Sequence, residues 1–330
     1  MRRVRWPIAS LLVLALGAAS LAGCGSSSGT AGARPATLVL DFTPNAVHAG
    51  IYSALARHYD RDAGVRLHVV APSSSTDPIK LLKTGRADFA ILDIHDLAIA
   101  RERGQDVVGI MAIVERPLAA VIAQPAVHDP AQLQGRLAGV TGVPSDTAVL
   151  DSIVSGAGGD PHRVRTITIG FNAVADLLAR RVTAATAFWN DEGVAIQRAR
   201  PGFHVFKVDA FGAPAYPELV LCATRASLRR DPALARDVVS ALVRGYRFTV
   251  AHPAAAAAAL ESHVQGLSPP VVAAELAALR PALQAAGGGV GQLDPAVLRR
   301  WARWEARFGI VRRQPDLSET FDRTFLPGSG

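Results

Sequence analysis

Short apolar stretches alternate with segments of helical periodicity through most of the chain. Apolar or alternating runs predict strands over 36–40, 65–70, 87–92, 107–114, 119–124, 137–141, 164–170 and 184–188. Between them, apolar positions recur every three or four residues, which predicts helices over 49–59, from Asp77, up to Arg103, and over 146–156 and 174–180. Such alternation of strand and helix indicates parallel sheets flanked by helices.

Beyond Asp231 the alternation stops and the pattern becomes mostly helical. Four helices are predicted, each with a proline near its first turn, where the missing amide hydrogen leaves no helical bond unmade. They span 232–251, 253–264, 270–285 and 295–308. Two α/β segments followed by helices predict a bilobal solute-binding architecture. We expect crossings between the lobes near 120–125 and 219–224, so that lobe 1 comprises 36–120 plus 223–330 and lobe 2 comprises 121–222.

Residues 1–23 have the pattern of an export signal. Three arginines among the first five residues precede an apolar stretch, and small residues then lead to Cys24. The sequence Leu-Ala-Gly-Cys resembles the lipobox of bacterial lipoproteins, which implies cleavage after residue 23 and acylation of Cys24. Residues 24–35 are rich in glycine and serine and predict a flexible tether. The alternative is a chance cysteine after an ordinary signal peptide. We favour general secretion, and the paired arginines leave the twin-arginine route open.

Composition narrows the classes of function. Of the 330 residues, 49% are hydrophobic and 19% are charged, which excludes a disordered or collagen-like chain. The one membrane-compatible stretch, 6–22, is short for a spanning helix of about 20 residues, so a polytopic membrane protein is excluded. Two cysteines, Cys24 and Cys222, exclude a disulfide framework, a multi-cysteine zinc site and an iron–sulfur cluster. Because the basic residues behind the net charge of +7 are scattered, we expect no nucleic-acid partner.

Familiar catalytic and metal-binding motifs are absent from the sequence. There is no G-x-S-x-G nucleophile elbow after a predicted strand and no Walker, H-E-x-x-H or Rossmann motif, and the glycines of 156–159 follow a predicted helix and mark its end. The nine histidines lie at spacings that no common metal motif uses, so we expect no metal site.

Polar and aromatic residues gather instead at the carboxyl ends of predicted strands, the edge at which open α/β sheets bind ligands. Taken singly, each also suits a turn, a helix cap or the core. Together they suit a flat nitrogen heterocycle, because rings stack on its faces and acids accept from its amino groups. We predict these ligand-binding residues: Asp41, Phe42, Asn45, His48, Tyr52, Asp93, His95, Ser145, Asp146, Asn172, Trp189, Asn190, Glu192, Tyr216 and Glu218.

Two of these residues carry a sharper expectation. We expect Trp189 to stack on the ring and Glu192 to accept from its amino group, with both side chains facing Asp41 and Asn45 across the ligand. The alternative for Trp189 is a core ring at the start of a helix, since large rings are usually buried.

Several segments, in chain order, carry a family resemblance. They are LDFTPNAVHAGIY at 40–52, GRADFAI at 85–91, and the segments 170–172, 188–192, 211–219 and 301–311. They resemble the formylaminopyrimidine- and hydroxymethylpyrimidine-binding proteins of ABC importers, which bind thiamine pyrimidine precursors, and the related thiamine pyrimidine synthases. The resemblance implies an α/β, bilobal, periplasmic-binding-protein-like fold with a hinge and C-terminal helices. Phe42 departs from it, because the family usually has tryptophan there.

Three features separate the chain from the synthases. The resemblance implies that a synthase has a lysine one turn before the histidine matched by His95, and that this lysine binds pyridoxal phosphate. Ile91 stands there instead and cannot form a Schiff base. The cysteine-rich, iron-binding stretch of the synthases corresponds to 213–217, which has no thiolate. An exported chain would also lack cytosolic pyridoxal phosphate. We therefore expect no catalytic residues and no cofactor.

These observations predict a substrate-binding lipoprotein of an ABC importer, anchored by lipid outside the cytoplasm on the bacterial cell membrane. The two lobes would close over a thiamine pyrimidine precursor or a similar small heterocycle, and the closed form would dock on the permease and ATPase subunits. We expect a monomer. Two alternatives stay open: a synthase-like enzyme dependent on pyridoxal phosphate and iron, and a receptor for another flat heterocycle such as a flavin.

Overall fold

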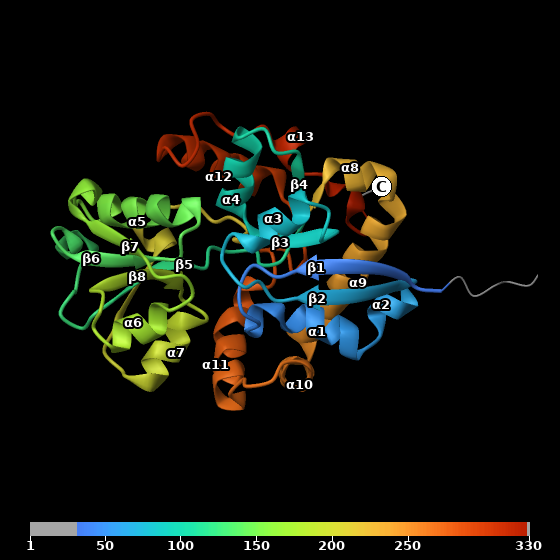
Figure 1. Cartoon of the computed structure of the whole chain (residues 1–330), viewed down its shortest axis with the longest axis horizontal. Coiled ribbons are helices and arrows are strands. Elements are labelled where there is room, and N and C mark those ends of the chain that lie inside the picture. The colour runs from blue at the N-terminus through green and yellow to red at the C-terminus, as the bar shows by residue number, and fades with distance from the viewer. Residues whose placement is uncertain (1–31, 329–330) are drawn as a thin grey trace, which may run out of the picture. The chain divides into compact units, whose positions relative to one another are not determined.

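The computed structural model describes residues 32–328, whose strands form two five-stranded sheets (Figure 1). The first sheet has the order β2-β1-β3-β10-β4, with β1 at Arg34–Val39, β2 at Val65–Val70, β3 at Phe89–Asp93, β4 at Val107–Ala112 and β10 at Leu219–Thr224. The second sheet has the order β7-β6-β8-β5-β9, with β5 at Ala119–Ala123, β6 at Leu137–Val140, β7 at Arg165–Thr168, β8 at Ala184–Phe188 and β9 at His204–Lys207.

The two sheets have the same topology. In the first, β1 pairs in parallel with β2 and β3, while β10 runs antiparallel to β3 and β4. In the second, β6 pairs in parallel with β7 and β8, while β5 runs antiparallel to β8 and β9. The antiparallel strand is in each case the one that arrives from the other sheet. The expected parallel pairing is confirmed for β1 and β6 and is wrong for β5 and β10, because a strand's apolar pattern carries no information about its direction.

The chain passes between the sheets twice. It leaves the first sheet after Ala112 and enters the second at Ala119, and it returns between Lys207 and Leu219. The expected crossings near 120–125 and 219–224 fall on β5 and β10, each of which lies within one sheet. An extended crossing and a buried strand are both short apolar runs, so the sequence does not separate them. The pattern also does not predict β9.

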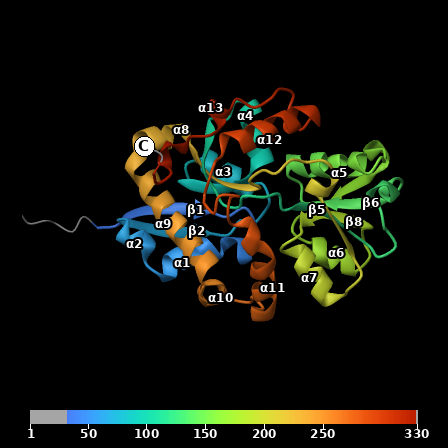
Figure 2. The same cartoon turned by 180° about the vertical axis from the view of Figure 1, so that it is seen from behind.

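Helices flank both sheets and make up most of the C-terminal third (Figures 1 and 2). Beside the first sheet lie α1 at Ala49–Ala56, α2 at Tyr59–Asp62, α3 at Asp77–Lys83 and α4 at Ile94–Glu102. Beside the second lie α5 at Pro144–Gly156, α6 at Ala173–Leu178 and α7 at Glu192–Ala199. The C-terminal helices are α8 at Arg225–Arg230, α9 at Pro232–Ala251, α10 at Pro253–His263, α11 at Pro269–Leu279, α12 at Pro295–Arg307 and α13 at Leu317–Thr320.

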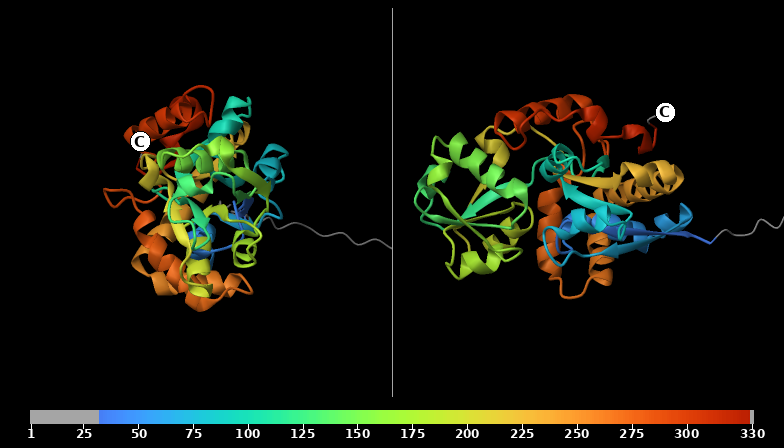
Figure 3. Two further views of the ribbon diagram at one scale, coloured as in Figure 1. Left: turned by 90° about the vertical axis from the view of Figure 1, so that its left-hand side faces the viewer. Right: turned by 45° about the horizontal axis from the view of Figure 1, so that its top comes forward.

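Most of the C-terminal helices pack on the first lobe, as Figure 3 shows from two further directions. The helix α9 packs on α1, α2 and β2, and α13 packs on α4 and β4. The helix α11 differs, because it contacts both the short 3-10 helix η1 (Ala46–His48) of the first lobe and α7 of the second. The first lobe therefore combines segments from both ends of the chain, and α11 reaches the neighbouring lobe.

The predicted signal peptide, Cys24 and most of the predicted tether lie outside the described residues. Between residues 32 and 328, no helix combines the length and the hydrophobicity that crossing a bilayer requires.

The helices α1 and α9 pack closely and hold the start of α1 in place. A Cβ atom on Gly245 would lie 2.1 Å from the carbonyl oxygen of Gly50, so the two backbones are in direct contact. The neighbouring Tyr246 is fully buried, and its hydroxyl donates to the carbonyl oxygen of Val47 at 2.9 Å. Because Val47 lies in η1, this contact ties the start of α1 to the core of the first lobe.

We expect Gly245→Ala to lower the free energy of unfolding by about 1–3 kcal/mol, because the added methyl group forces α9 away from α1. The matched control is Gly193→Ala in α7, where a Cβ atom would meet nothing closer than 3.6 Å. That variant should be unchanged or more stable by up to about 1 kcal/mol, since alanine favours the helical backbone. Urea denaturation measures both. Equal effects of the two substitutions would contradict the packing argument.

Candidate ligand-binding site

A cavity lies between the two lobes, at the carboxyl ends of β1, β3, β6 and β8. The space inside it in which the centre of a water molecule can lie is about 100 Å³, which is room for several waters or a small ligand. The first lobe contributes Asp41, Phe42, Ser75, Pro78, Ile91, Leu92, Asp93, Asp96 and Leu219. The second contributes Ala119, Ala120, Thr141, Val143, Ser145, Asp146, Val149, Phe171, Thr186, Ala187, Phe188 and Glu192.

Direct contacts hold the lobes together around this cavity. The Nδ2 of Asn45 in the first lobe donates to Oδ2 of Asp191 in the second at 2.9 Å. The backbone N–H of Ser145 donates to Oδ1 of Asp96 at 3.3 Å. The structure is therefore in a closed arrangement, with polar contacts made across the seam.

Aromatic rings from both lobes meet at the cavity. The ring centroids of Phe42 in the first lobe and Phe171 in the second lie 4.3 Å apart, edge to face. Phe188 adds a third ring at the end of β8. Because Phe42 and Phe171 belong to different lobes, a flat ligand would contact both rings only when the lobes close.

Five carboxyl groups line the cavity, and protein groups already hold several of them. Asp146 accepts from the Thr141 hydroxyl at 2.6 Å and from the Gly142 amide at 2.9 Å. Glu192 accepts from the amide of Phe188 at 3.0 Å. Burial, reinforced by the neighbouring Asp191, raises the pKa of Glu192 to about 8. These acids are consequently oriented before any ligand arrives.

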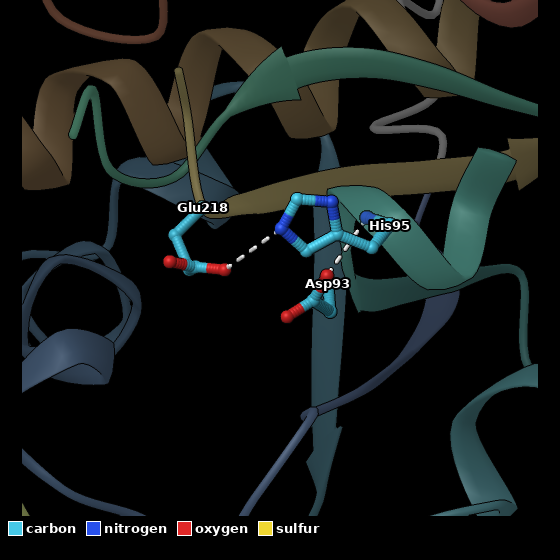
Figure 4. Close-up of side chains that lie close together, drawn as sticks. All are labelled: Asp93, His95 and Glu218. Carbon is cyan, nitrogen blue, oxygen red and sulfur yellow. Dashed lines mark hydrogen bonds and ion pairs between the residues drawn. The ribbon is translucent and has the colours of Figure 1, made fainter. Parts of the chain in front are cut away.

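Behind the cavity wall lies a buried network centred on His95 (Figure 4). Oδ1 of Asp93, which lines the cavity, accepts from the His95 amide at 2.7 Å. The imidazole Nδ1 pairs with Glu305 of α12, and Nε2 lies 3.1 Å from the Tyr216 hydroxyl and 3.8 Å from Oε1 of Glu218. Burial alone would lower the pKa of His95, but the carboxylates of Glu305, Asp93 and Glu218 raise it to about 10.

Glu218 connects this network to the crossing between the lobes. Its Oε2 accepts from the backbone amides of Leu118 and Ala119, where the chain enters β5. Candidate metal-ligand atoms of Asp93, His95 and Glu218 lie within 4.8 Å of one another. A metal ion bound at Nε2 of His95 would have to take the place of the Tyr216 hydroxyl, which lies 3.1 Å from that nitrogen.

The structure brings six of the predicted ligand-binding residues to the cavity: Asp41, Phe42, Asp93, Ser145, Asp146 and Glu192. The other nine do not line it: Asn45, His48, Tyr52, His95, Asn172, Trp189, Asn190, Tyr216 and Glu218. Of these nine, Asn172 is exposed, where its side chain donates to the Ile169 carbonyl, and Asn190 is fully buried with no hydrogen-bond partner in the described chain.

Some of the nine support lining residues from behind. His48 is fully buried, and its Nε2 lies 3.0 Å from Oδ1 of Asp41, while its Nδ1 accepts from the amide of Asn45 at 3.1 Å. His48 therefore orients Asp41 at the cavity edge. Tyr52 is buried one turn into α1, with its ring 5.7 Å from that of His263. Its position in the helix points to a packing role.

Trp189 does not face Asp41 and Asn45 across the cavity. Its Nε1 donates to the carbonyl oxygen of Pro117 at 2.9 Å, and the Lys207 ammonium lies 4.0 Å from its ring centroid. It lines a separate cavity beside the crossing segment. The indole is drawn there because its N–H finds an acceptor in the backbone of the crossing, which the sequence does not reveal.

The list of predicted ligand-binding residues omits several residues that line the cavity, although some of them leave a signal in the sequence. Phe171 belongs to the family-like segment 170–172, and Asp96 follows Asp93 within the first turn of α4. Thr186 is the one hydroxyl in the otherwise apolar strand β8, where it is buried. A buried hydroxyl within an apolar strand indicates a hydrogen-bonding demand, and this signal would have found Thr186.

The sequence model of the family described as NMT1/THI5 like matches residues 45–256. The chain belongs to this family. The matched segment runs from η1 into α10 and includes all of the second lobe.

Three relatives show the range of this NMT1/THI5-like family. A formylaminopyrimidine-binding protein of Halalkalibacterium halodurans is 30% identical over 66% of this chain and 66% of its own length. A 4-amino-5-hydroxymethyl-2-methylpyrimidine phosphate synthase of Legionella pneumophila is 21% identical over 66% of this chain and 70% of its own. A riboflavin-binding protein of Chloroflexus aurantiacus is 24% identical over 88% of this chain and 86% of its own.

Solved structures agree on the bilobal α/β fold. The alkanesulfonate-binding protein SsuA of Xanthomonas axonopodis pv. citri superposes with a TM-score of 0.71 at 15% identity, covering 89% of this chain and 100% of that one. The expected periplasmic-binding-protein-like fold is thereby confirmed.

The His95 network predicts a measurable pH dependence. Since the folded-state pKa of His95 is raised from 6.5 to about 10, its contribution to stability is complete below pH 6.5 and is lost as the pH rises through about 10. At pH 6, His95→Asn should lower the free energy of unfolding by about 3–5 kcal/mol, because it leaves buried carboxylates without a counter-charge. The difference from the wild type should shrink towards pH 10. Denaturant titrations across this range measure it, and a difference that is constant with pH would contradict a charged imidazole.

Proposed function

We propose that this chain is the extracytoplasmic solute receptor of an ABC importer and binds a thiamine pyrimidine precursor between its lobes. The observation that carries the proposal is the interlobe cavity, in which phenylalanine rings from both lobes meet five carboxyl groups and several hydroxyls. A flat, amino-bearing heterocycle has matching chemistry, because its faces stack on rings and its amino hydrogens need acceptors. The likeness to the formylaminopyrimidine-binding protein supports the same class of ligand.

The arrangement supports a hinge mechanism. Ligand held by one lobe would be enclosed when the other lobe brings its ring and carboxyl groups against it, and the contacts between Asn45 and Asp191 would hold the closed form. The closed monomer would then present both lobes to the permease, which is powered by its ATPase subunits. The crossing segment near Leu118, fastened by Glu218, is the point about which the lobes would turn.

The residues of the cavity do not fit the synthase chemistry found elsewhere in the family. Ile91, at the place of the synthase lysine, is fully buried and lines the cavity, so a lysine there would reach the ligand and isoleucine offers no amine. The cavity lining has no lysine, arginine or histidine that would bind the phosphate of pyridoxal phosphate. The replacement of the iron-binding stretch by 213–217 adds to this disagreement. We therefore propose a receptor rather than an enzyme.

A flavin receptor is the second candidate, since the riboflavin-binding relative matches most of this chain. The two candidates share ring stacking and differ in ligand size. Isothermal titration calorimetry of the purified protein with formylaminopyrimidine, hydroxymethylpyrimidine and riboflavin separates them. Binding of a pyrimidine without riboflavin supports the proposal, riboflavin alone supports the second candidate, and binding of neither overturns both.

Phe42 gives a direct test of stacking. We expect Phe42→Ala to weaken binding of the preferred ligand by about 1–2 kcal/mol, through the lost contact area and ring–ring interaction. The same titration measures this effect. Phe248→Ala is the matched control, because Phe248 is a partly buried ring on α9 that stacks under Arg57 far from the cavity lining. Unchanged affinity in Phe42→Ala would remove this ring from the site.

The proposed lipid anchor has its own test. Cys24 follows Leu-Ala-Gly and precedes a glycine- and serine-rich segment, as in acylated lipoproteins. We expect Cys24→Ala to leave the precursor unprocessed or to release the protein from the membrane fraction, as cell fractionation and the mass of the N-terminal peptide would show. Normal processing and complete membrane retention of the variant would rule out acylation at this residue.

A further inference from the structure

The ionisable groups that line the interlobe cavity all have one sign. Its lining includes the carboxyl groups of Asp41, Asp93, Asp96, Asp146 and Glu192, and no lysine, arginine or histidine. A site built for an anion carries the opposite set, with arginines or lysines aimed at the ligand. The charge of the lining residues therefore gives information about the charge of the ligand, which the aromatic rings do not give.

Three of these five acids have no basic side chain paired with them in the described residues, whereas Asp41 has the His48 imidazole 3.0 Å away. His95 lies nearest to Asp93, but its single charge is already shared with Glu305 and Glu218. Asp96, Asp146 and Glu192 form no ion pair with any basic side chain in the described part of the chain. Only bound protons or a positively charged ligand can therefore neutralise these three carboxylates.

Asp96 and Asp146 lie on opposite sides of the seam between the lobes. Asp96 of α4 accepts from the amide of Ser145, the residue beside Asp146 at the start of α5. Oδ2 of Asp146 accepts from the Thr141 hydroxyl and the Gly142 amide, which fix this carboxyl group at the cavity. Burial, together with Asp93 and Asp146, raises the pKa of Asp96 well above its ordinary value. When the lobes close without a ligand, the carboxyl groups of Asp96 and Asp146 are therefore brought near each other across the boundary between the lobes.

We propose that the site selects a cationic solute: among the heterocycles of the proposed function, on which this inference rests, one that carries an ammonium group in preference to a neutral or phosphorylated one. An aminomethyl-substituted pyrimidine is such a solute, since its side-chain amine is protonated at neutral pH. The ammonium group would lie at the seam between Asp96 and Asp146. It would replace the protons that these acids hold in the empty site, so binding releases protons and favours closure.

Calorimetric titration of the purified protein at pH 7 tests this with pyrimidines that share one ring and differ at position 5. The substituents are aminomethyl, hydroxymethyl, formylaminomethyl and phosphorylated hydroxymethyl. We expect the aminomethyl compound to bind at least about 10-fold more tightly than the neutral ones, and the phosphate ester not to bind. Repeating the titration in buffers of different ionisation enthalpy should reveal proton release with the amine alone.

The outcomes distinguish this inference from the proposed function. Equal or tighter binding of a neutral pyrimidine, without proton release, overturns the cationic preference and leaves a pyrimidine receptor. Failure of every pyrimidine to bind overturns the proposed function itself. Binding of the phosphate ester contradicts the charge argument directly.

Replacing a carboxylate by a carboxamide tests which acid is responsible for the preference for a cationic ligand. Asp96→Asn should weaken binding of the aminomethyl compound about 10-fold more than binding of the hydroxymethyl compound, because the amide keeps the shape and loses the charge. Asp146→Asn is the second variant, in case the first does not fold as judged by its melting curve. The control is Asp151→Asn on α5, outside the cavity lining. Equal losses for both ligands would show that Asp96 acts through shape and not charge.

Discussion

One buried cation holds together parts of the chain that are far apart in sequence. His95 at the start of α4 pairs with Glu305 of α12, and its other nitrogen faces Tyr216 and Glu218 just before β10. Glu218 in turn fastens the backbone where β5 begins. Removing a partner from such a cluster leaves an uncompensated charge in the interior, which is far more costly than losing a surface pair. The cavity wall, the crossing and the C-terminal helices therefore depend on one another.

The shared topology of the two sheets explains why a site forms here. In both lobes the parallel strands end towards the other lobe, and the antiparallel strand begins there. The residues that follow β1, β3, β6 and β8 consequently converge on one space. Turn and cap residues such as Asp93, which accepts from the His95 amide in the first turn of α4, therefore also line the cavity.

Much of this could be predicted from the sequence, because strand ends are local features. Asp41 and Asp93 follow apolar runs, and their place at the ligand-binding edge needs only the alternation of strand and helix. The sequence does not predict where a side chain lies when its position depends on a partner that is distant in the chain. Trp189 turns towards the Pro117 carbonyl and His95 towards Glu305, and neither partner can be recognised from the residues beside them. The direction of β5 and β10 could not be predicted for the same reason, because it depends on the sheet from which each strand arrives.

The position of Trp189 makes its fluorescence sensitive to the arrangement of the two lobes. Its indole N–H is bonded to the crossing segment and its ring lies under the Lys207 ammonium, so any rotation of the lobes alters the polarity around that one chromophore. Trp301 and Trp304 are buried on α12 beside His95, in the core of the first lobe. In the proposed hinge mechanism, the fluorescence of Trp189 would therefore report the opening and closing of the lobes without any attached label.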